Sequence, residues 1–308
     1  MTTNLYGFFD KNTDLEKHSI VDNEKNSSFF IKPKSFLSKG KLVSLESPLI
    51  MTVLNITPDS FYERLPYPND IEFTVKKVAE LLPFTDILDL GAVSTRPGAK
   101  SVTEKEELLR LLPHLEAIVK NFPDLCISVD TFRSGVAKTA VEMGASIIND
   151  VSAGEMDPLM FDAVARLKVP YIMMHMKGTP ENMQQNPQYE DVIPEIMFYF
   201  ATKLEQLNKR GLSDIIIDPG FGFGKSIDDN YKILNHLDEF RIFELPLLVG
   251  FSRKSMIQKV LGVSGEGALT GTTVLNTIAI TKGANILRVH DPKEARQVCT
   301  LIQKLRSV

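Results

Sequence analysis

Short apolar runs alternate with longer amphipathic segments along the chain from residue 49 onward. The runs are nearly continuous in Ile, Val, Leu and Met, which is typical of parallel strands that are buried on both faces. Between them, apolar residues recur at helical spacing, and several of these segments end near Gly or Pro, as helices do. The predicted strands are 49–55, 86–91, 125–131, 146–151, 170–175, 214–220, 246–252 and 285–290, and the predicted helices include 74–82, 105–122, 161–167, 193–211 and 292–305.

The number of strand-helix units favours a (β/α)8 barrel (a TIM barrel) over a doubly wound sheet, which usually has fewer strands. Before the first unit, Lys39 and Gly40 separate two short alternating runs and indicate a β-hairpin, which we expect to close the bottom of the barrel. We therefore predict an α/β fold with one barrel domain over residues 36–308. Residues 1–35 are rich in Asn, Asp, Ser and Lys without periodicity, and there we expect a flexible N-terminal extension.

Each predicted strand carries polar residues at its C-terminal end. Because these ends share one face of a closed parallel barrel, residues that are scattered along the sequence converge on one pocket. This convergence is the main functional signal in the sequence. The strand-end residues are Asn55, Asp89, Asp130, Asn149, His175, Asp218, Ser252, Arg253, Lys254, Arg288 and His290.

The composition is that of an ordinary globular chain. Of 308 residues, 43% are hydrophobic and 24% charged, and 35 basic residues against 39 acidic ones give a net charge of -4, which argues against a general nucleic-acid binder. No apolar stretch is long enough to span a membrane, and the N-terminus lacks a secretory signal, so we expect a cytoplasmic protein. Cys126 and Cys299 are expected to be buried thiols, and the dispersed histidines argue against a structural zinc site.

The glycine-rich stretch from Asp218 to Ser226 does not match a nucleotide-binding loop. Pro219 stands where a Walker A loop needs glycine, and the glycine spacing misses the dinucleotide fingerprint. The glycines fit a flexible connection between strand and helix equally well. Asp218 itself ends a strand and therefore faces the common pocket.

Asp130 and Asn149 have two interpretations. They either cap the helices that follow them, or they join Asp218 in binding the N–H groups of a nitrogen heterocycle. Carboxylates accept paired N–H bonds, while a carboxamide both donates and accepts, which suits an aminopyrimidinone ring. Lys254 would complete such a site by donating to the ring carbonyl and a ring nitrogen.

A second group of strand-end residues suits a polyanion. Arg288 lies within an apolar strand, and a buried guanidinium needs a carboxylate or a ligand anion beside it. His290 is a weaker signal, because Asp291 and Pro292 also fit the start of the last helix. The candidate polyanion site consists of Asn55, Thr95, Arg96, Arg288 and His290.

Two further stretches have both a structural and a functional interpretation. Ser252 to Ser255 precede a predicted helix, whose free N–H groups attract a carboxylate, although a serine cap explains the same residues. Met173, Met174 and Met176 are expected to belong to the core more often than to the floor of a ligand site. His175 alone indicates a hydrogen-bonded structural histidine.

Taken together, the strand-end motifs resemble those of dihydropteroate synthase. Single stretches are weak signals, but the ordered set is highly specific and spans residues 36–308. The early hairpin is likewise similar to the plug at the barrel bottom of this family. The matching stretches are LNITPDSF (54–61), STRPGA (94–99), SVDT (128–131), IND (148–150), MHMKGTPENMQ (174–184), DPGFGFGK (218–225), GFSRKSMI (250–257) and RVHD (288–291).

The resemblance implies an enzyme that condenses 6-hydroxymethyl-7,8-dihydropterin diphosphate with p-aminobenzoate, giving dihydropteroate and pyrophosphate for folate synthesis. It implies Mg²⁺ as cofactor, two small-molecule substrates, no nucleic-acid or membrane partner, and a homodimer formed through barrel helices. Asn55 would bind the magnesium. The residues implied to hold the pterin are Asp130, Asn149, Asp218 and Lys254, with Met174 and Arg288 against its faces.

The other implied subsites surround the pterin. Those on the diphosphate oxygens are Thr95, Arg288 and His290. Those around p-aminobenzoate are Arg96, Pro97, Phe223, Arg253 and Ser255. Those implied to act in catalysis are Asp130, Lys254, Arg288 and His290.

The implied mechanism needs little acid-base chemistry. Magnesium, Arg288 and His290 would stabilise the charge on the departing pyrophosphate, so that the C–O bond breaks before the arylamine attacks. Asp130 and Asp218 would favour the cationic pterin, and no covalent enzyme intermediate is required.

The sequence departs from the family in two loops. Tyr62, Glu63 and Arg64 follow the first motif where the family usually has Ser-Asp-Gly, and Ala92 and Val93 replace a Gly-Glu pair. We therefore expect the first loop to close differently and the second to lack a carboxylate. Turnover rate and sulfonamide response depend on both loops.

Two alternative functions stay open. A related pterin-binding barrel transfers a methyl group from methyltetrahydrofolate to a corrinoid protein, but it needs no diphosphate subsite, so the SRKS and RVH stretches speak against it. A catalytically silent barrel kept as an assembly partner would accumulate loop changes first. The intact Asn55, Lys254, Arg288 and His290 argue against that alternative.

Overall fold

The computed structural model describes residues 35–57, 70–93, 102–179, 182–183 and 187–308. The predicted N-terminal extension lies outside the described residues, so it stays a prediction. The same is true of Thr95, Arg96 and Pro97, and of the altered first loop from Tyr62 to Arg64.

The described residues form one parallel sheet of eight strands, in the order β8-β7-β6-β5-β4-β3-β10-β9. A parallel bridge between Ile217 and Leu247 joins the two ends of this order, so the sheet closes on itself. The predicted (β/α)8 barrel is confirmed. The strands are β3 (Leu49–Asn55), β4 (Ile87–Gly91), β5 (Cys126–Asp130), β6 (Ile147–Asp150), β7 (Tyr171–Met174), β8 (Ile215–Asp218), β9 (Leu248–Val249) and β10 (Ile286–Val289).

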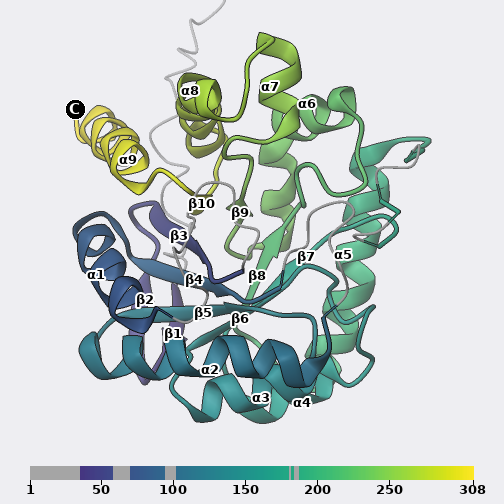
Figure 1. The fold of residues 1–308 in the computed structure, drawn as a ribbon. Coiled ribbons are helices and arrows are strands. Elements are labelled where there is room, and N and C mark those ends of the chain that lie inside the picture. Colours follow the sequence, from purple (N-terminus) through teal and green to yellow (C-terminus); the bar gives the residue numbers. More distant parts are fainter. Residues whose placement is uncertain (1–34, 58–69, 94–101, 180–181, 184–186) are drawn as a thin grey trace, which may run out of the picture. The chain divides into compact units, whose positions relative to one another are not determined.

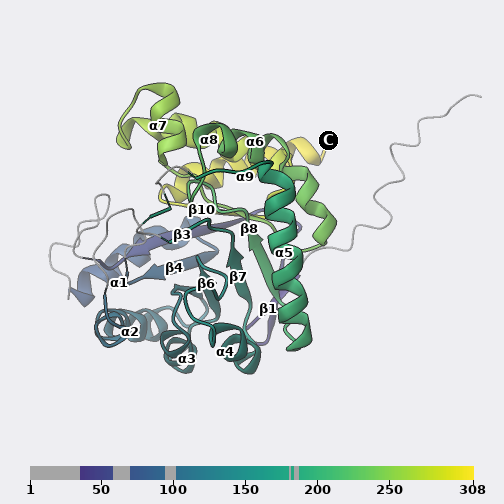
Figure 2. The same ribbon diagram turned by 90° about the vertical axis from the view of Figure 1, so that its right-hand side faces the viewer.

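Helices surround the strands as a ring (Figure 1; Figure 2 gives the view turned by 90°). Several begin at a side-chain cap, such as Thr103 before α2 and Ser226 before α6. The α-helices are α1 (Ile71–Leu81), α2 (Glu104–Asn121), α3 (Ser134–Glu142), α4 (Met160–Leu167), α5 (Val192–Lys209), α6 (Ile227–Asn235), α7 (Ser255–Leu261), α8 (Leu269–Thr281) and α9 (Pro292–Arg306), and the 3-10 helices are η3 (Leu82–Phe84), η4 (Leu237–Phe243) and η5 (Glu266–Ala268).

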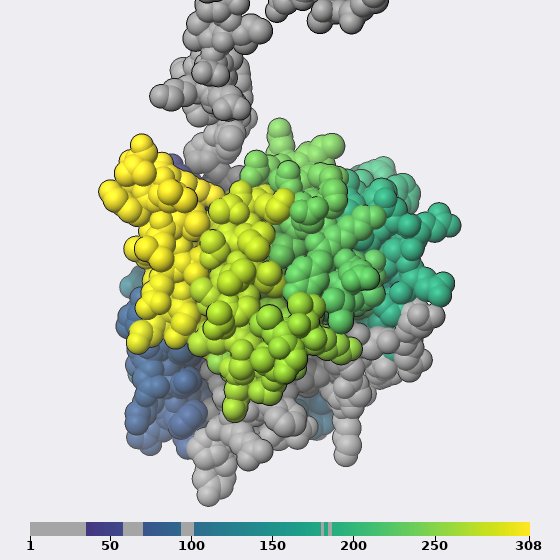
Figure 3. Space-filling model, turned by 90° about the horizontal axis from the view of Figure 1, so that it is seen from above, coloured from purple at the N-terminus to yellow at the C-terminus, as the bar shows by residue number. Residues whose placement is uncertain are grey.

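Helices α7, α8 and α9 lie side by side on one face of the barrel, in yellow-green and yellow in Figure 3. Helix α8 packs between the other two. No helix among the described residues is both long and apolar enough to cross a membrane.

The predicted hairpin is confirmed and closes one end of the barrel. It consists of β1 (Ser35–Ser38) and β2 (Lys41–Ser44), paired antiparallel. Its turn places Lys39 and Gly40 in the left-handed region, at φ values of 48° and 74°. Phe36 is only 1% exposed and packs, with Leu45, against the inward side chains at the beginnings of the barrel strands.

The alternation of side chains along each strand builds the site. Outward residues such as Leu88 and Leu90 join the large core beneath the helices. Inward residues at the strand beginnings form an apolar floor above the hairpin: Met51, Ile87, Ile147, Ile172, Ile216, Leu248 and Ile286. Two positions further along the same strands stand Val53, Asp89, Asn149, Met174, Asp218, Gly250 and Arg288. The polar layer therefore begins directly above the apolar floor.

Candidate functional site

Arg288 on β10 joins two carboxylates from neighbouring strands. Its Nε donates to Oδ2 of Asp89 on β4, and its Nη2 donates to Oδ2 of Asp130 on β5, both at 2.7 Å. The side-chain Nδ2 of Asn149 on β6 donates to the same Asp89 oxygen at 3.1 Å. One network thus holds four strands together at the polar layer, and it supplies the carboxylate that the buried Arg288 was predicted to need.

Burial sets the charge state of this network. It raises the pKa of Asp130 to about 7, although the Arg288 guanidinium acts in the opposite direction. Burial alone would lower the pKa of Arg288, but Asp89 and Asp130 raise it above its ordinary value. Two carboxylates share one guanidinium, so the network favours a ligand that brings further N–H donors.

Asp218 and Lys254 form the second charged part of the site. Asp218 ends β8, is 6% exposed, and its Oδ1 accepts a hydrogen bond from Gly220 N at 2.8 Å. Lys254 Nζ donates to the carbonyl of Phe221 at 2.5 Å and lies 4.6 Å from the centre of the Phe223 ring. Burial lowers the pKa of Lys254 to about 8 and raises that of Asp218, and each of the two charges opposes the other's shift.

An apolar surface lies beside these charges. Met174 at the end of β7 packs in one cluster with Val151, Met176 and Met183, and the ring of Phe223 lies against that cluster. Met173, by contrast, belongs to the main core, as predicted. A sulfur-rich wall beside fixed polar groups suits a flat heterocycle.

The rim between β9 and β10 carries His290 and Arg253. Ser252 Oγ accepts a hydrogen bond from His290 N at 3.3 Å and lies 3.3 Å from its Nδ1. The Nε and Nη2 of Arg253 donate to the two carboxylate oxygens of Asp291, at 2.8 and 2.5 Å.

Of two expectations about helix starts there, one is confirmed and one is wrong. Asp291 and Pro292 stand at the N-cap and at the start of α9, as predicted, although the Asp291 side chain makes no capping bond and instead binds Arg253. The residue before α7 is Lys254, whose side chain makes no cap either, so the plain serine cap is wrong. Ser255 is the first residue of α7 and is exposed.

Asn55 ends β3 and is partly buried, with its side chain toward the end of β4. A Cβ atom on Gly91 would lie 3.1 Å from Asn55 Oδ1. Magnesium in phosphate-binding enzymes is usually held through one or two carboxylates together with substrate phosphates and water. Among the described residues, no group of three or more His, Cys, Asp or Glu side chains stands together as a metal site. Asn55 Oδ1 is an oxygen donor of the kind that can join phosphate oxygens and water around a magnesium ion.

Two residues of the site have no assigned role in the sequence prediction. Asp89 is fully buried at the centre of the network, and its place follows from Ile87 two positions earlier, which faces the barrel floor. Lys225 is 4% exposed and donates to Nδ1 of His175 at 3.0 Å. Nothing in the sequence distinguishes Lys225 from a solvent-exposed lysine at the end of a loop.

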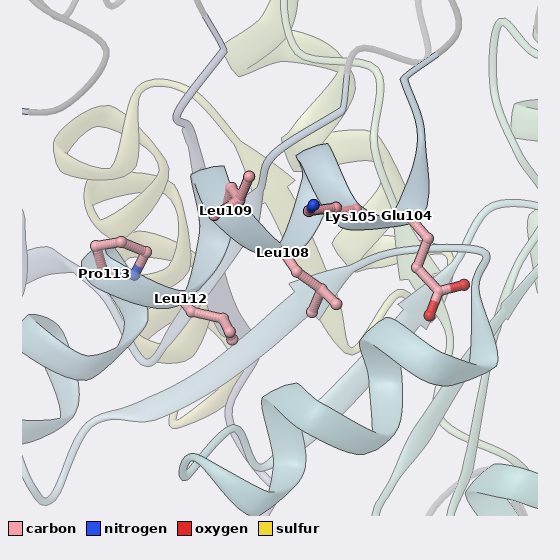
Figure 4. A pocket seen from close by; sticks show the side chains of 6 residues that line it. All are labelled: Glu104, Lys105, Leu108, Leu109, Leu112 and Pro113. Atoms are coloured by element: carbon pink, nitrogen blue, oxygen red, sulfur yellow. The ribbon is translucent and has the colours of Figure 1, made fainter.

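An open pocket of 530 Å³ runs along α2 (Figure 4). The described residues that line it all belong to that helix, and none of them is a strand-end residue. We place the functional site at the strand ends instead, because the buried, paired charges lie there. The residues that line the α2 pocket are Glu104, Lys105, Leu108, Leu109, Leu112 and Pro113.

Comparison with known proteins gives consistent matches over this barrel. The pterin binding enzyme family matches residues 51–290. The dihydropteroate synthase of Escherichia coli K12 is 39% identical over 268 residues, which cover 86% of this chain and 94% of that protein. That of Haemophilus influenzae is 39% identical over 258 residues, 82% of this chain and 92% of its own length.

Solved structures agree with the sequence matches. The Yersinia pestis dihydropteroate synthase in a sulfonamide drug complex superposes with a TM-score of 0.85 at 38% identity, covering 89% of this chain and all of that one. The Xanthomonas albilineans enzyme with 4-aminobenzoic acid gives a TM-score of 0.83 at 36% identity and covers 90% of this chain. The chain therefore belongs to the pterin-binding enzyme family and, within it, to the dihydropteroate synthases.

Proposed function

We propose that the strand-end residues carry out the dihydropteroate synthase reaction, in which 6-hydroxymethyl-7,8-dihydropterin diphosphate and p-aminobenzoate give dihydropteroate and pyrophosphate. The observation that carries this assignment is one cluster at the strand ends, in which Asp130, Asn149 and Asp218 are buried and Lys254 and Arg288 are partly buried.

The pterin is bound by hydrogen bonds to its edge and by packing against its faces. Asp130 and Asp218 accept N–H bonds from the ring, and Asn149 both donates and accepts. Lys254 donates to the ring carbonyl and a ring nitrogen. Met174 supplies apolar contact, and Arg288 stacks against the other face. The two carboxylates favour positive charge on the ring when the C–O bond breaks.

The leaving pyrophosphate and the attacking amine have separate binding groups. Arg288 and His290 stabilise the charge that develops on the pyrophosphate oxygens, together with Thr95. Bound Mg²⁺ supplies further charge stabilisation there, and Asn55 with the diphosphate oxygens would hold it. Phe223, Arg253, Ser255, Arg96 and Pro97 shape the p-aminobenzoate site. The neutral amine attacks and then loses its proton to water or pyrophosphate.

The assay is pyrophosphate release. Purified protein with Mg²⁺, pterin diphosphate and p-aminobenzoate is expected to release pyrophosphate and form dihydropteroate, while a reaction without p-aminobenzoate forms no dihydropteroate. Protein that binds the pterin without releasing pyrophosphate would contradict the proposal and favour the silent barrel. Methyl transfer from methyltetrahydrofolate to a corrinoid protein would favour the related barrel.

A homodimer through barrel helices accompanies this proposal. Large apolar side chains are exposed on α7, α8 and α9. An isologous dimer would bury this same patch on both subunits. The exposed residues are Val260 (56%), Leu261 (52%), Val274 (52%), Leu301 (72%) and Leu305 (67%). A cytoplasmic location rests on the sequence alone.

A further inference from the structure

We infer that Lys225 is a positioning residue, which holds the glycine-rich loop of residues 218–225 against residues 174–177 and thereby fixes Lys254 in the site. The inference rests on the proposed role of Lys254 in pterin binding. It assigns a task to a motif that the sequence alone leaves without one.

Lys225 joins two segments of chain through one buried amino group, whose pKa is lowered to about 7 by burial. Its Nζ donates to the carbonyls of Gly220 at 2.9 Å and Phe223 at 3.0 Å, within its own loop. In the segment after β7 it lies 3.2 Å from the carbonyl oxygen of His175 and 3.0 Å from His175 Nδ1, two acceptors that share its third N–H. Burial lowers the pKa of His175 to about 2, so this ring is neutral and its Nδ1 is able to accept.

The two segments are in direct backbone contact, and glycine permits it. A Cβ atom on Gly220, at φ +72°, would lie 1.9 Å from the carbonyl oxygen of His175. One on Gly224, at φ +62°, would lie 2.2 Å from that of Lys177. Such close approach brings several acceptors, the carbonyls of Gly220, Phe223 and His175 and the Nδ1 of His175, to one buried amino group, and buried acceptors need a donor. Lys225 is therefore the donor that this packing requires.

The same loop contacts Lys254 from its other side. The carbonyl of Phe221 accepts from Lys254 Nζ, and the ring of Phe223 lies under that ammonium group. A Cβ atom on Gly222 would lie 3.1 Å from Lys254 Cδ, so the loop backbone itself packs on the lysine stem. Movement of the loop would consequently move the Lys254 ammonium out of place.

A double-mutant cycle tests the inference by pterin affinity, measured calorimetrically without turnover. Lys225→Met is expected to weaken pterin binding about tenfold while the protein stays folded. In the Lys254→Ala background, the same substitution is expected to add little, because the residue acts through Lys254. Lys232→Met on α6, where the side chain is 46% exposed, is the matched control and should leave the affinity unchanged.

Additive effects of Lys225→Met and Lys254→Ala, or an unchanged affinity in folded Lys225→Met, would overturn the inference. Should Lys225→Met fail to fold, Lys225→Gln, which is shorter and lacks the ammonium group, replaces it in the same cycle with Lys254→Ala. Lys225→Arg is also expected to restore part of the affinity lost in Lys225→Met. Wild-type protein that binds pterin but releases no pyrophosphate would contradict the proposed function. The double-mutant cycle would still test the inference, because it measures pterin affinity and not turnover.

Discussion

Arg288 and Asp89 lie 199 positions apart in the sequence, yet Nε of the arginine donates to Oδ2 of the aspartate at 2.7 Å. The Asp89 side chain is fully buried, and that of Arg288 is 20% exposed. The guanidinium also binds Asp130, so its removal leaves two buried carboxylates without their cation.

Arg288→Ala is therefore expected to lower the free energy of unfolding by about 3–5 kcal/mol, as measured by urea denaturation. The double variant with Asp89→Asn should recover part of that loss, because one buried charge is gone. Arg166→Ala, at an exposed position on α4, is the control. A loss for Arg288→Ala as small as the control's would mean that the carboxylates do not depend on this cation.

The same variant is expected to lose more in kcat than in pterin affinity, when both are measured well below its melting temperature. The edge of the pterin keeps its contacts with Asn149, Asp218 and Lys254, whereas charge on the leaving pyrophosphate loses a stabilising group. Equal losses in both quantities would count against the division into pterin and diphosphate subsites.

Lys254→Ala is expected to weaken pterin binding by about 10-fold to 100-fold, because a charged donor to the ring is removed. Calorimetric titration of a pterin without the diphosphate measures this effect apart from catalysis. Lys259→Ala, at an exposed position in α7, should bind like the wild type. Equal affinities for all three proteins would remove Lys254 from the pterin site.

Most of the fold and much of the site follow from sequence pattern. Strand β3 matches its predicted bounds of 49–55, because a strand buried on both faces has a continuous apolar run. Strand β9 is shorter than its predicted bounds of 246–252: Leu248–Val249 pair with β10, and Leu247 adds a single bridge to Ile217. At its beginning, Pro246 has no N–H group to donate to a neighbouring strand. Helix α8 is not among the predicted helices, because its Thr-rich, β-branched sequence has weak helix propensity. Its packing against α9 stabilises the helix instead.

Partner choice among charged residues could not be predicted. That Arg288 needs a carboxylate follows from burial, but the choice of Asp89 and Asp130 depends on how the strands are staggered in the closed barrel. Likewise, the binding of Arg253 to Asp291 joins two loops, and no local spacing in the sequence encodes it. The role of Lys225 depends on backbone contacts between two loops that are far apart in the sequence, so no sequence pattern predicts it.

Arg253→Ala is expected to raise the KM for p-aminobenzoate by about tenfold or more and to leave pterin affinity unchanged. The two hydrogen bonds to Asp291 hold the guanidinium in one orientation at the rim. Arg253→Lys keeps the charge without the paired geometry and should fall between wild type and Arg253→Ala. Steady-state kinetics with the pterin substrate in excess give the KM, and an unchanged KM in both variants would exclude Arg253 from that subsite.

Val274→Glu and Leu301→Glu are each expected to convert the proposed dimer to a monomer, as measured by sedimentation velocity. Each substitution places a charge on the apolar face of α8 and α9. In a symmetric dimer, both subunits would bury that charge in the interface. Phe198→Glu, at a 76% exposed position on α5, is the control for an equal change elsewhere. A wild-type protein that sediments as a monomer would contradict the dimer.

His175 is expected to make the protein sensitive to acid. Burial lowers its pKa to about 2, against an ordinary value of 6.5, so between these values the unfolded chain binds one more proton than the folded protein. The free energy of unfolding therefore falls with decreasing pH by about 1.4 kcal/mol per unit below 6.5 from this group. His175→Gln keeps an acceptor for Lys225 but does not titrate, so urea denaturation from pH 7 to 4 should show a shallower decline than in the wild type. His236→Gln, at a half-exposed position beside Glu239, is the control. Equal slopes for His175→Gln and wild type would show that the folded protein accommodates the protonated His175 ring.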